Sequence, residues 1–392
     1  MEASVLPLEA QARAEAGAAG VPWNVAAALF ASTCVVAGIT WDISWHITIG
    51  RDSFWNPAHV TEYVGGLVAG LSCGWVAVRS TFAGPPAERS RLVRFWGFYG
   101  PLGGWICIWG TFAMLTSAPF DNWWHNAYGL DVEILSPPHT LLALGILAIQ
   151  FGALVMALAW QNNATGDGAR PARLLFAYAL GIMLLMTAIM GTEHFFRSFM
   201  HTSDFYRSAA LVFPVFLAAA LRSSGLRWPA TSVAAVYTLG RLLAVWILPL
   251  FPGTPRLGPI YQDITRMVPP DFPLLVIVPA VALDLVFRHA LSRRSDWINA
   301  VVLGLVFLGV FLAVQWPFAE FLMSPLARNR FFATVNFPYF LPKTTRSYRY
   351  LFIALDPDRA ALLKGLAVAA VLAMLSTRLG LAWGAWMRTV RR

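Results

Sequence analysis

Long apolar runs separated by short polar stretches set the pattern of this chain. A helix needs about 20 apolar residues to cross a bilayer, and runs of that length recur along most of the sequence. The pattern predicts membrane-spanning helices at 22–41, 60–80, 95–117, 138–160, 173–195, 206–223, 228–250, 273–291, 297–321 and 360–385. The predicted fold class is therefore an all-α integral membrane protein, a polytopic bundle of about ten transmembrane helices.

The composition supports the same class. Of the 392 residues, 58% are hydrophobic and 12% are charged, and the mean hydropathy is +0.60. Soluble domains carry roughly 25% charged residues. Residues 1–21 lack the basic start and the apolar core of a secretory signal peptide, so we expect a short cytoplasmic segment there.

The net charge of +9 comes from arginines that lie mostly in alternate connections between the predicted helices. This distribution follows the positive-inside rule and gives no reason to expect nucleic acid as a partner. Placing these connections in the cytoplasm puts both termini there. The segments that then face outward are 42–59, 121–137, 196–205, 252–272 and 322–359.

Segment 322–359 contains Arg328, Asn329 and Arg330 and is too polar to span a membrane. We expect it to lie along the outer surface, where it covers a site or docks a partner. Its own Arg and Lys content favours the opposite orientation, but long loops count less than short ones in this rule.

The cysteines Cys34, Cys73 and Cys107 each fall inside a predicted span. None has the Cys-x-x-Cys spacing, so neither a disulfide framework nor a thiolate metal site is expected. They are interpreted as small core residues.

One polar pattern occurs twice. The first set is Asp42, His46 and His59, and the second set is Asp121, His125 and His139. In both sets His follows Asp by four residues, and the second His follows thirteen or fourteen residues later. Asp and His at i, i+4 share one face of a helix, and a His from the following helix can complete a three-ligand site. Carboxylate and imidazole ligands suit copper, zinc or iron. The alternative is that these residues only border the bilayer.

Two further features belong to each set. Pro57 and Pro138 precede the last His and are expected to lie in the first turn of the next helix, where proline is tolerated. Asp52 and Asp131 lie between the two histidines and could orient a ligating imidazole by hydrogen bonding. Alternatively, Asp52 pairs with its neighbour Arg51, or both aspartates cap helices.

A third polar group contains Glu193, His194, Arg197 and His201. If the helix continues there, Glu193, Arg197 and His201 follow at i, i+4 and i+8 on one face. This group is interpreted as a third metal site, as side chains that support the other sites (Glu193, His194 and His201), or as a ladder of ion pairs. The sequence leaves these three interpretations open.

Two charges fall within predicted spans, Arg241 and Asp284. Their distances from the span ends place them at similar depth, so we expect a structural ion pair that stabilises the bundle. A buried ion pair by itself is weak support for catalysis.

The run from Asp42 to His59, with Trp45, Arg51-Asp52 and Phe54, resembles the C subunit of the copper membrane monooxygenases, the particulate methane and ammonia monooxygenases. The resemblance covers residues 22–185. It implies that the first set binds copper, and that the second set, 79 residues further on, corresponds to a family set with Asn in place of Asp121. Residues 186–392 have no counterpart in this comparison and form an additional transmembrane region.

The resemblance implies a multi-pass protein of a bacterial inner membrane with its metal sites toward the periplasmic face. The expected function is oxidation of a small substrate by dioxygen at a copper site. The expected electron donor is a quinol or another reductant. The expected partners in the lipid membrane are further subunits or other copies of this chain. Zinc or iron is the alternative metal. The alternative functions are a non-enzymatic copper-handling or structural membrane protein, and an ion-coupled transporter.

Overall fold

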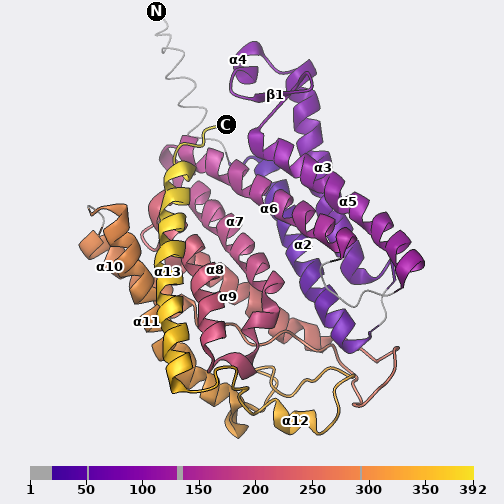
Figure 1. Cartoon of the computed structure of the whole chain (residues 1–392). Coiled ribbons are helices and arrows are strands. Elements are labelled where there is room, and N and C mark those ends of the chain that lie inside the picture. Colours follow the sequence, from indigo (N-terminus) through magenta and orange to yellow (C-terminus); the bar gives the residue numbers. More distant parts are fainter. Residues whose placement is uncertain (1–19, 51–52, 130–135, 292–293) are drawn as a thin grey trace, which may run out of the picture.

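A computed structural model describes residues 20–50, 53–129, 136–291 and 294–392 of the chain (Figure 1). The described residues form a helical bundle, and the paired strands are confined to one short hairpin. The long helices are α2 (Trp23–Thr48), α3 (Pro57–Phe82), α5 (Leu102–Tyr128), α6 (Pro137–Asn163), α7 (Ala169–Met190), α8 (Ser203–Ser223), α9 (Pro229–Ile247), α11 (Asp296–Met323) and α13 (Arg359–Met387).

The remaining elements are short. They are α4 (Pro86–Arg89), β1 (Val93–Phe95), β2 (Phe98–Gly100), η1 (Gly166–Gly168), η2 (Thr192–Phe195), η3 (Arg197–Phe199), η4 (Leu248–Leu250), α10 (Ile277–Val286), the π-helical turn η5 (Phe287–Leu291), η6 (Pro325–Ala327) and α12 (Thr345–Tyr348). Strands β1 and β2 pair antiparallel, with Arg94 opposite Tyr99.

Eight helices in the described part of the chain are long and apolar enough to cross a membrane. The expectation of about ten spans is thus supported for eight. Helix α5 has 27 residues but is not among these eight. Helix α10 has 10 residues where a span over 273–291 was expected, and at 1.5 Å per residue it covers only about half of a hydrocarbon core.

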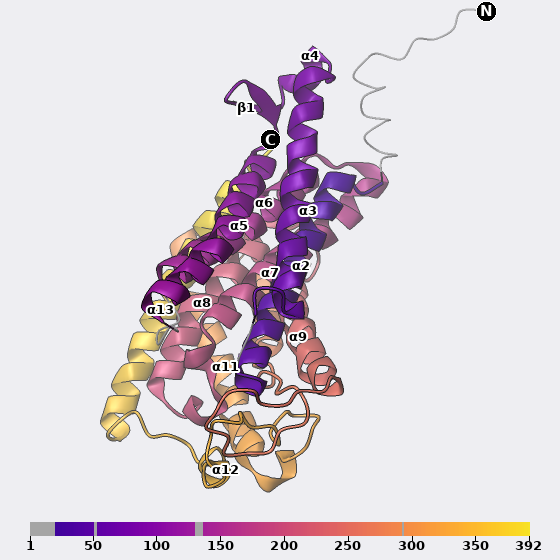
Figure 2. The same ribbon diagram turned by 90° about the vertical axis from the view of Figure 1, so that its right-hand side faces the viewer.

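The bundle has two distinct ends (Figures 1 and 2). The hairpin end carries α4, the β1–β2 hairpin and the C-terminus. The loop end carries α12 and the two long connections, 251–276 and 324–358. Because the long helices alternate in direction, α2, α5 and α7 run toward the loop end, and α3, α6 and α8 run back from it.

The core lies mainly between α7, α8 and α11. Its largest fully buried aromatic side chains are Phe176, Phe205, Tyr206, Phe213, Phe307 and Phe311. Helix α13 packs along α8 and α11, whereas α2–α3 and α5–α6 form two close helix pairs. Each of these two pairs carries one of the Asp/His sets.

The α5–α6 pair approaches closely because small residues face each other. A Cβ added to Gly145 would lie 2.6 Å from the backbone N of Met114 and 2.9 Å from the carbonyl O of Gly110. Such contacts leave no room for a side chain at Gly145. The close approach holds the end of α5 beside the start of α6.

The long connections at the loop end are tied to the bundle by polar contacts. Arg197 Nη2 lies 2.8 Å from Asp271 Oδ1, and Arg241 donates to the carbonyl O of Asp271 at 2.8 Å. The two connections also contact each other, since the Tyr261 N–H donates to the carbonyl O of Tyr339 at 2.9 Å. Residues 324–358 are irregular apart from η6 and α12.

Candidate metal centre

The first set joins α2 to α3. Helix α2 does not end near residue 41 as expected but continues to Thr48, so Asp42 and His46 lie on one face of its last two turns. His59 lies in the first turn of α3, where Asn56 caps the helix by accepting a hydrogen bond from the His59 N–H at 2.7 Å. Asp42 lies between the two rings, with Oδ2 3.5 Å from His46 Nε2 and Oδ1 3.3 Å from His59 Nε2.

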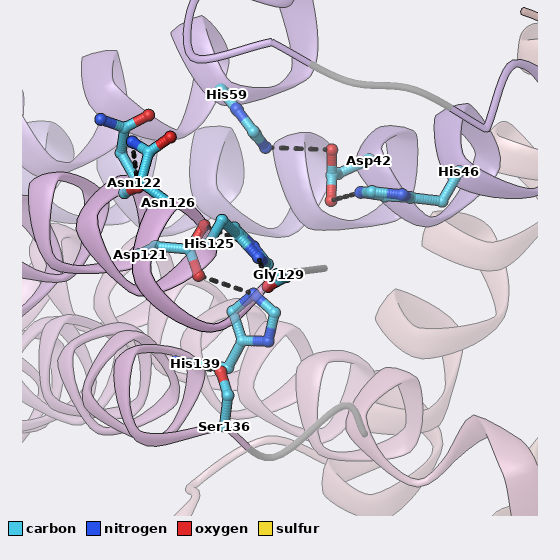
Figure 3. A network of polar contacts seen from close by, with 10 residues as sticks. All are labelled: Asp42, His46, His59, Asp121, Asn122, His125, Asn126, Gly129, Ser136 and His139. Carbon is cyan, nitrogen blue, oxygen red and sulfur yellow. Dashed lines mark hydrogen bonds and ion pairs between the residues drawn. The ribbon is translucent and has the colours of Figure 1, made fainter. Parts of the chain in front are cut away.

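The second set repeats this construction on α5 and α6 (Figure 3). Asp121 Oδ2 lies 3.3 Å from His125 Nε2, one turn along α5. Asp121 Oδ1 lies 3.4 Å from His139 Nε2 on α6. Ser136 caps α6 by accepting from the His139 N–H at 3.4 Å. Pro57 and Pro137 hold the first helical position of α3 and α6, so Pro138 is the second residue of its helix.

The ring of His125 has its orientation fixed by the end of α5. Nδ1 lies 3.1 Å from the carbonyl O of Gly129. A carbonyl can only accept, so this contact places a proton on Nδ1 and leaves Nε2 as the nitrogen that faces Asp121 and that could bind an ion. Gly129 has a φ of +90°, a conformation that favours glycine, and this turn brings its carbonyl back to the ring.

The two sets differ in how closely their donor atoms converge. Within the described residues, the second set alone has one donor atom from each of its three residues within 4.8 Å of the other two. In both sets the two histidines approach different oxygens of the aspartate, but in the first set His46 and His59 lie on opposite sides of Asp42 (Figure 3). The second set is therefore the better formed candidate for holding an ion.

Both sets are partly open to their surroundings. The side chain of His46 is 48% exposed, and those of His125 and His139 are 28% and 36% exposed. Aromatic rings border them: Tyr128 packs on Trp124 beside the second set, with ring centroids 4.5 Å apart. An ion or small molecule can thus reach the donor atoms.

The third polar group does not form one helix face. Phe196 adopts an extended conformation between η2 and η3, so the helix that would align Glu193, Arg197 and His201 is interrupted. Glu193 is exposed, and His194 Nδ1 lies 3.7 Å from Asp204 Oδ2. Asp52 and Asp131 lie outside the described residues.

The remaining members of that group have structural partners. Arg197 is buried and pairs with Asp271. The His201 ring is stacked between Trp316 and Phe352, with centroids 4.1 Å and 3.6 Å away. The structure therefore does not support Glu193, His194 and His201 as neighbours of the two sets.

The expected pair of Arg241 with Asp284 is replaced by other contacts. The Asp284 carboxylate accepts from the N–H groups of Ala230 and Thr231, at 3.2 and 2.8 Å, and from the Thr231 hydroxyl at 2.6 Å. It caps the start of α9, whose first N–H groups have no partner within the helix. Arg241 lies eleven residues further along α9, about 16 Å away at 1.5 Å per residue.

Sequence reasoning overlooked Glu62. It lies on α3 one turn after His59, and its side chain is buried. Its position at i+3 from a predicted ligand is the signal that would have identified it.

Protein-family models, curated proteins and solved structures all yield no match to this chain. The resemblance to the copper monooxygenase C subunit therefore remains a prediction that rests on the motif alone. The geometry of the two sets is independent of it.

Proposed function

We propose that this chain is a multi-pass membrane protein that binds a transition-metal ion at Asp121, His125 and His139. The observation that carries the proposal is the convergence of one donor atom from each residue within 4.8 Å. Two imidazoles and one carboxylate suit copper, zinc or non-haem iron. The residues present thus fit copper, the metal implied by the motif, without selecting it over the other two.

Each residue of the second set would have a definite role in binding the ion. Three protein ligands leave at least one coordination position for water or a substrate, as in catalytic metal sites. Asp121 contributes a negative charge that offsets the charge of the cation. Gly129 keeps the lone pair of His125 Nε2 directed into the site by accepting from Nδ1–H.

We further propose that the bound ion is copper and that the protein oxidises a small substrate with dioxygen. A redox-active copper ion supplies one-electron chemistry at such a centre. The Asp42–His59 run and its repetition support this proposal. A quinol from the membrane is the proposed reductant, and the partly exposed position of the sets at the loop end allows entry of a small apolar substrate from lipid.

The test is the metal content of the full chain purified in nanodiscs, by elemental analysis and EPR on one sample. We expect about one or two equivalents of copper with a nitrogen-ligated type 2 signal. A His46→Ala/His125→Ala variant should lose it. The matched control is His289→Ala, an exposed histidine near the hairpin end. Unchanged copper content in the double variant would refute copper binding at these sets.

Oxygen consumption then separates catalysis from metal handling. Quinol-dependent oxygen uptake that disappears in the double variant supports the oxidase chemistry. Copper binding without oxygen uptake favours the copper-handling function, with which the 48% exposure of His46 is consistent. Zinc or iron in place of copper would reassign the metal and remove the basis for the proposed copper chemistry.

A further inference from the structure

An apolar cavity lies between the β1–β2 hairpin and the start of α5. Its volume is about 290 Å³, and Val93 and Phe95 line it from β1, whereas Leu102, Trp105 and Trp109 line it from α5. The hairpin is tied to α5 at this place, because Trp105 Nε1 donates to the carbonyl O of Val93 at 3.1 Å. Leu102 and Trp109 are seven residues apart, so the lining follows α5 for about 10 Å. A cavity of this shape and lining suits a hydrocarbon chain.

The tip of the hairpin holds an exposed tryptophan beside this cavity. Trp96 and Gly97 join the two strands, and their φ angles are +47° and +87°. A two-residue turn of this kind favours glycine or asparagine, and a bulky residue adopts it at a cost. Trp96 is nevertheless 78% exposed, and its ring centroid lies 5.5 Å from that of Trp109. Exposed tryptophans are typical of the boundary between a bilayer and water.

The opposite face of the hairpin carries positive charge. Alternate side chains of a strand point to opposite faces, so Arg94 points away from the cavity that Val93 and Phe95 line. The guanidinium carbons of Arg94 and Arg89 lie 5.8 and 5.9 Å from the centroid of the Tyr99 ring. Neither arginine forms an ion pair within the described residues. An anion at this ring would be stabilised by both charges.

The whole connection between α3 and α5 is basic. Residues 83–101 contain three arginines, Arg89, Arg91 and Arg94, and one acidic residue, Glu88. Basic residues next to a membrane-spanning helix attract the anionic headgroups of the cytoplasmic leaflet. The orientation predicted from the arginines of the short connections places this hairpin on that side. The charge of the hairpin is therefore complementary to an anionic lipid surface.

We propose that the β1–β2 hairpin binds one anionic phospholipid, whose phosphate contacts Arg89 and Arg94 and whose acyl chain occupies the cavity. One phospholipid spans about half of a bilayer of roughly 40–45 Å, whereas packed sheet layers are only about 10 Å apart. A single molecule can thus pass around the edge of this two-stranded ribbon and reach both of its faces. The inference goes beyond the proposed metal binding, because the hairpin and the two Asp/His sets lie at opposite ends of the bundle.

The test uses the full chain in a neutral detergent. Phosphatidylglycerol is the anionic probe, and phosphatidylcholine with the same chains is the neutral probe. Native mass spectrometry measures which lipids remain bound. We expect one phosphatidylglycerol to bind more tightly than phosphatidylcholine. Arg89→Gln/Arg94→Gln should lower the affinity for phosphatidylglycerol by at least about tenfold, because two positive charges next to the phosphate are removed.

Two further variants show whether this loss belongs to the hairpin. The matched control, Arg391→Gln/Arg392→Gln, removes two exposed arginines at the same end of the bundle and should leave the affinity unchanged. Arg89→Lys/Arg94→Lys keeps the charge and should retain most of the affinity. Inorganic phosphate in excess should not displace the lipid, because it has no chain to occupy the cavity.

Each outcome supports or overturns the proposal. Equal affinity for the two lipids in the unaltered chain overturns it, without any variant that has to fold. Equal affinity of the unaltered chain and of Arg89→Gln/Arg94→Gln also overturns it. A similar loss in the control would show attraction by overall charge instead of a site at the hairpin. Full displacement by inorganic phosphate would assign the arginines to a free anion and overturn the lipid assignment.

Discussion

Asp121 and His139 stand on consecutive helices, with the carboxylate Oδ1 3.4 Å from the imidazole Nε2. This contact joins the last turns of α5 to the first turn of α6. The candidate metal centre therefore depends on how these two helices pack as well as on the residues themselves.

Replacing Asp121 with Asn keeps the shape of the side chain but removes its charge. In a His46→Ala/His59→Ala background, which leaves only the second set, metal affinity should fall by at least about tenfold, since a negative ligand is lost. Competition with a chelator measures the affinity. Asp167→Asn, in η1 at the hairpin end, is the control and should have no effect. Equal affinity in both variants would remove Asp121 from the ligand set.

Replacing Gly145 with Ala should disturb both stability and metal binding. The added methyl group would collide with the backbone of Met114 and of Gly110, so α5 and α6 must separate. We expect a loss of about 1–3 kcal/mol in the free energy of unfolding, together with weaker metal binding at the second set. Unfolding in detergent and chelator competition measure the two effects.

The matched control for Gly145 is Gly74→Ala on α3. A Cβ there meets nothing within 4 Å. Alanine at this helical position should raise stability by up to about 1 kcal/mol and leave metal binding unchanged. A Gly145→Ala variant that behaves like the control would show that close packing of α5 on α6 does not support the site.

Replacing Asp284 with Ala should destabilise the start of α9. The carboxylate accepts three hydrogen bonds there, and their loss leaves the buried N–H of Ala230 and the half-buried N–H of Thr231 without this partner. We expect a cost of about 2 kcal/mol, as for hydrogen bonds to a charged group. Hydrogen exchange should increase at the first turn of α9. Asp263→Ala, at an exposed position, should change neither quantity.

His201 should make stability depend on pH. Burial between Trp316 and Phe352 lowers the pKa of its imidazole below the ordinary value of 6.5, although the hydrogen bond to the Trp316 carbonyl and the charge of Glu320 act in the opposite direction. The unfolded chain therefore binds a proton more readily than the folded chain. The contribution of neutral His201 is complete above pH 6.5 and is lost as pH falls through the lower pKa of the folded state.

His201→Gln should reduce this loss of stability on acidification. Melting temperatures of the two proteins, measured from about pH 7.5 to about pH 5, provide the comparison. His289→Gln, at an exposed site, is the control and should retain the full pH dependence. Identical pH profiles for the unaltered chain and His201→Gln would show that this ring does not titrate in the range.

The elements of this fold were largely predictable from the apolar runs. Eight of the expected spans correspond to helices of sufficient length and hydropathy. The expected span over 273–291 was wrong in length. Helix α10 begins only at Ile277, and a π-helical turn follows it from Phe287. The apolar pattern alone shows neither boundary. Helix ends were also misplaced: α2 and α5 continue through their Asp and His residues.

The sequence by itself determined the arrangement of ligands on single helices. Asp and His four residues apart must share a face, and a proline before the last His begins the next helix. Contacts between helices could not be predicted in this way. The partner of Asp284, the burial of Glu62 and the convergence of the second set were decided by the tertiary structure. The reason is physical. Helical periodicity fixes the directions in which side chains point from one helix, whereas side-chain size and packing fix which helices are in contact and how closely they approach.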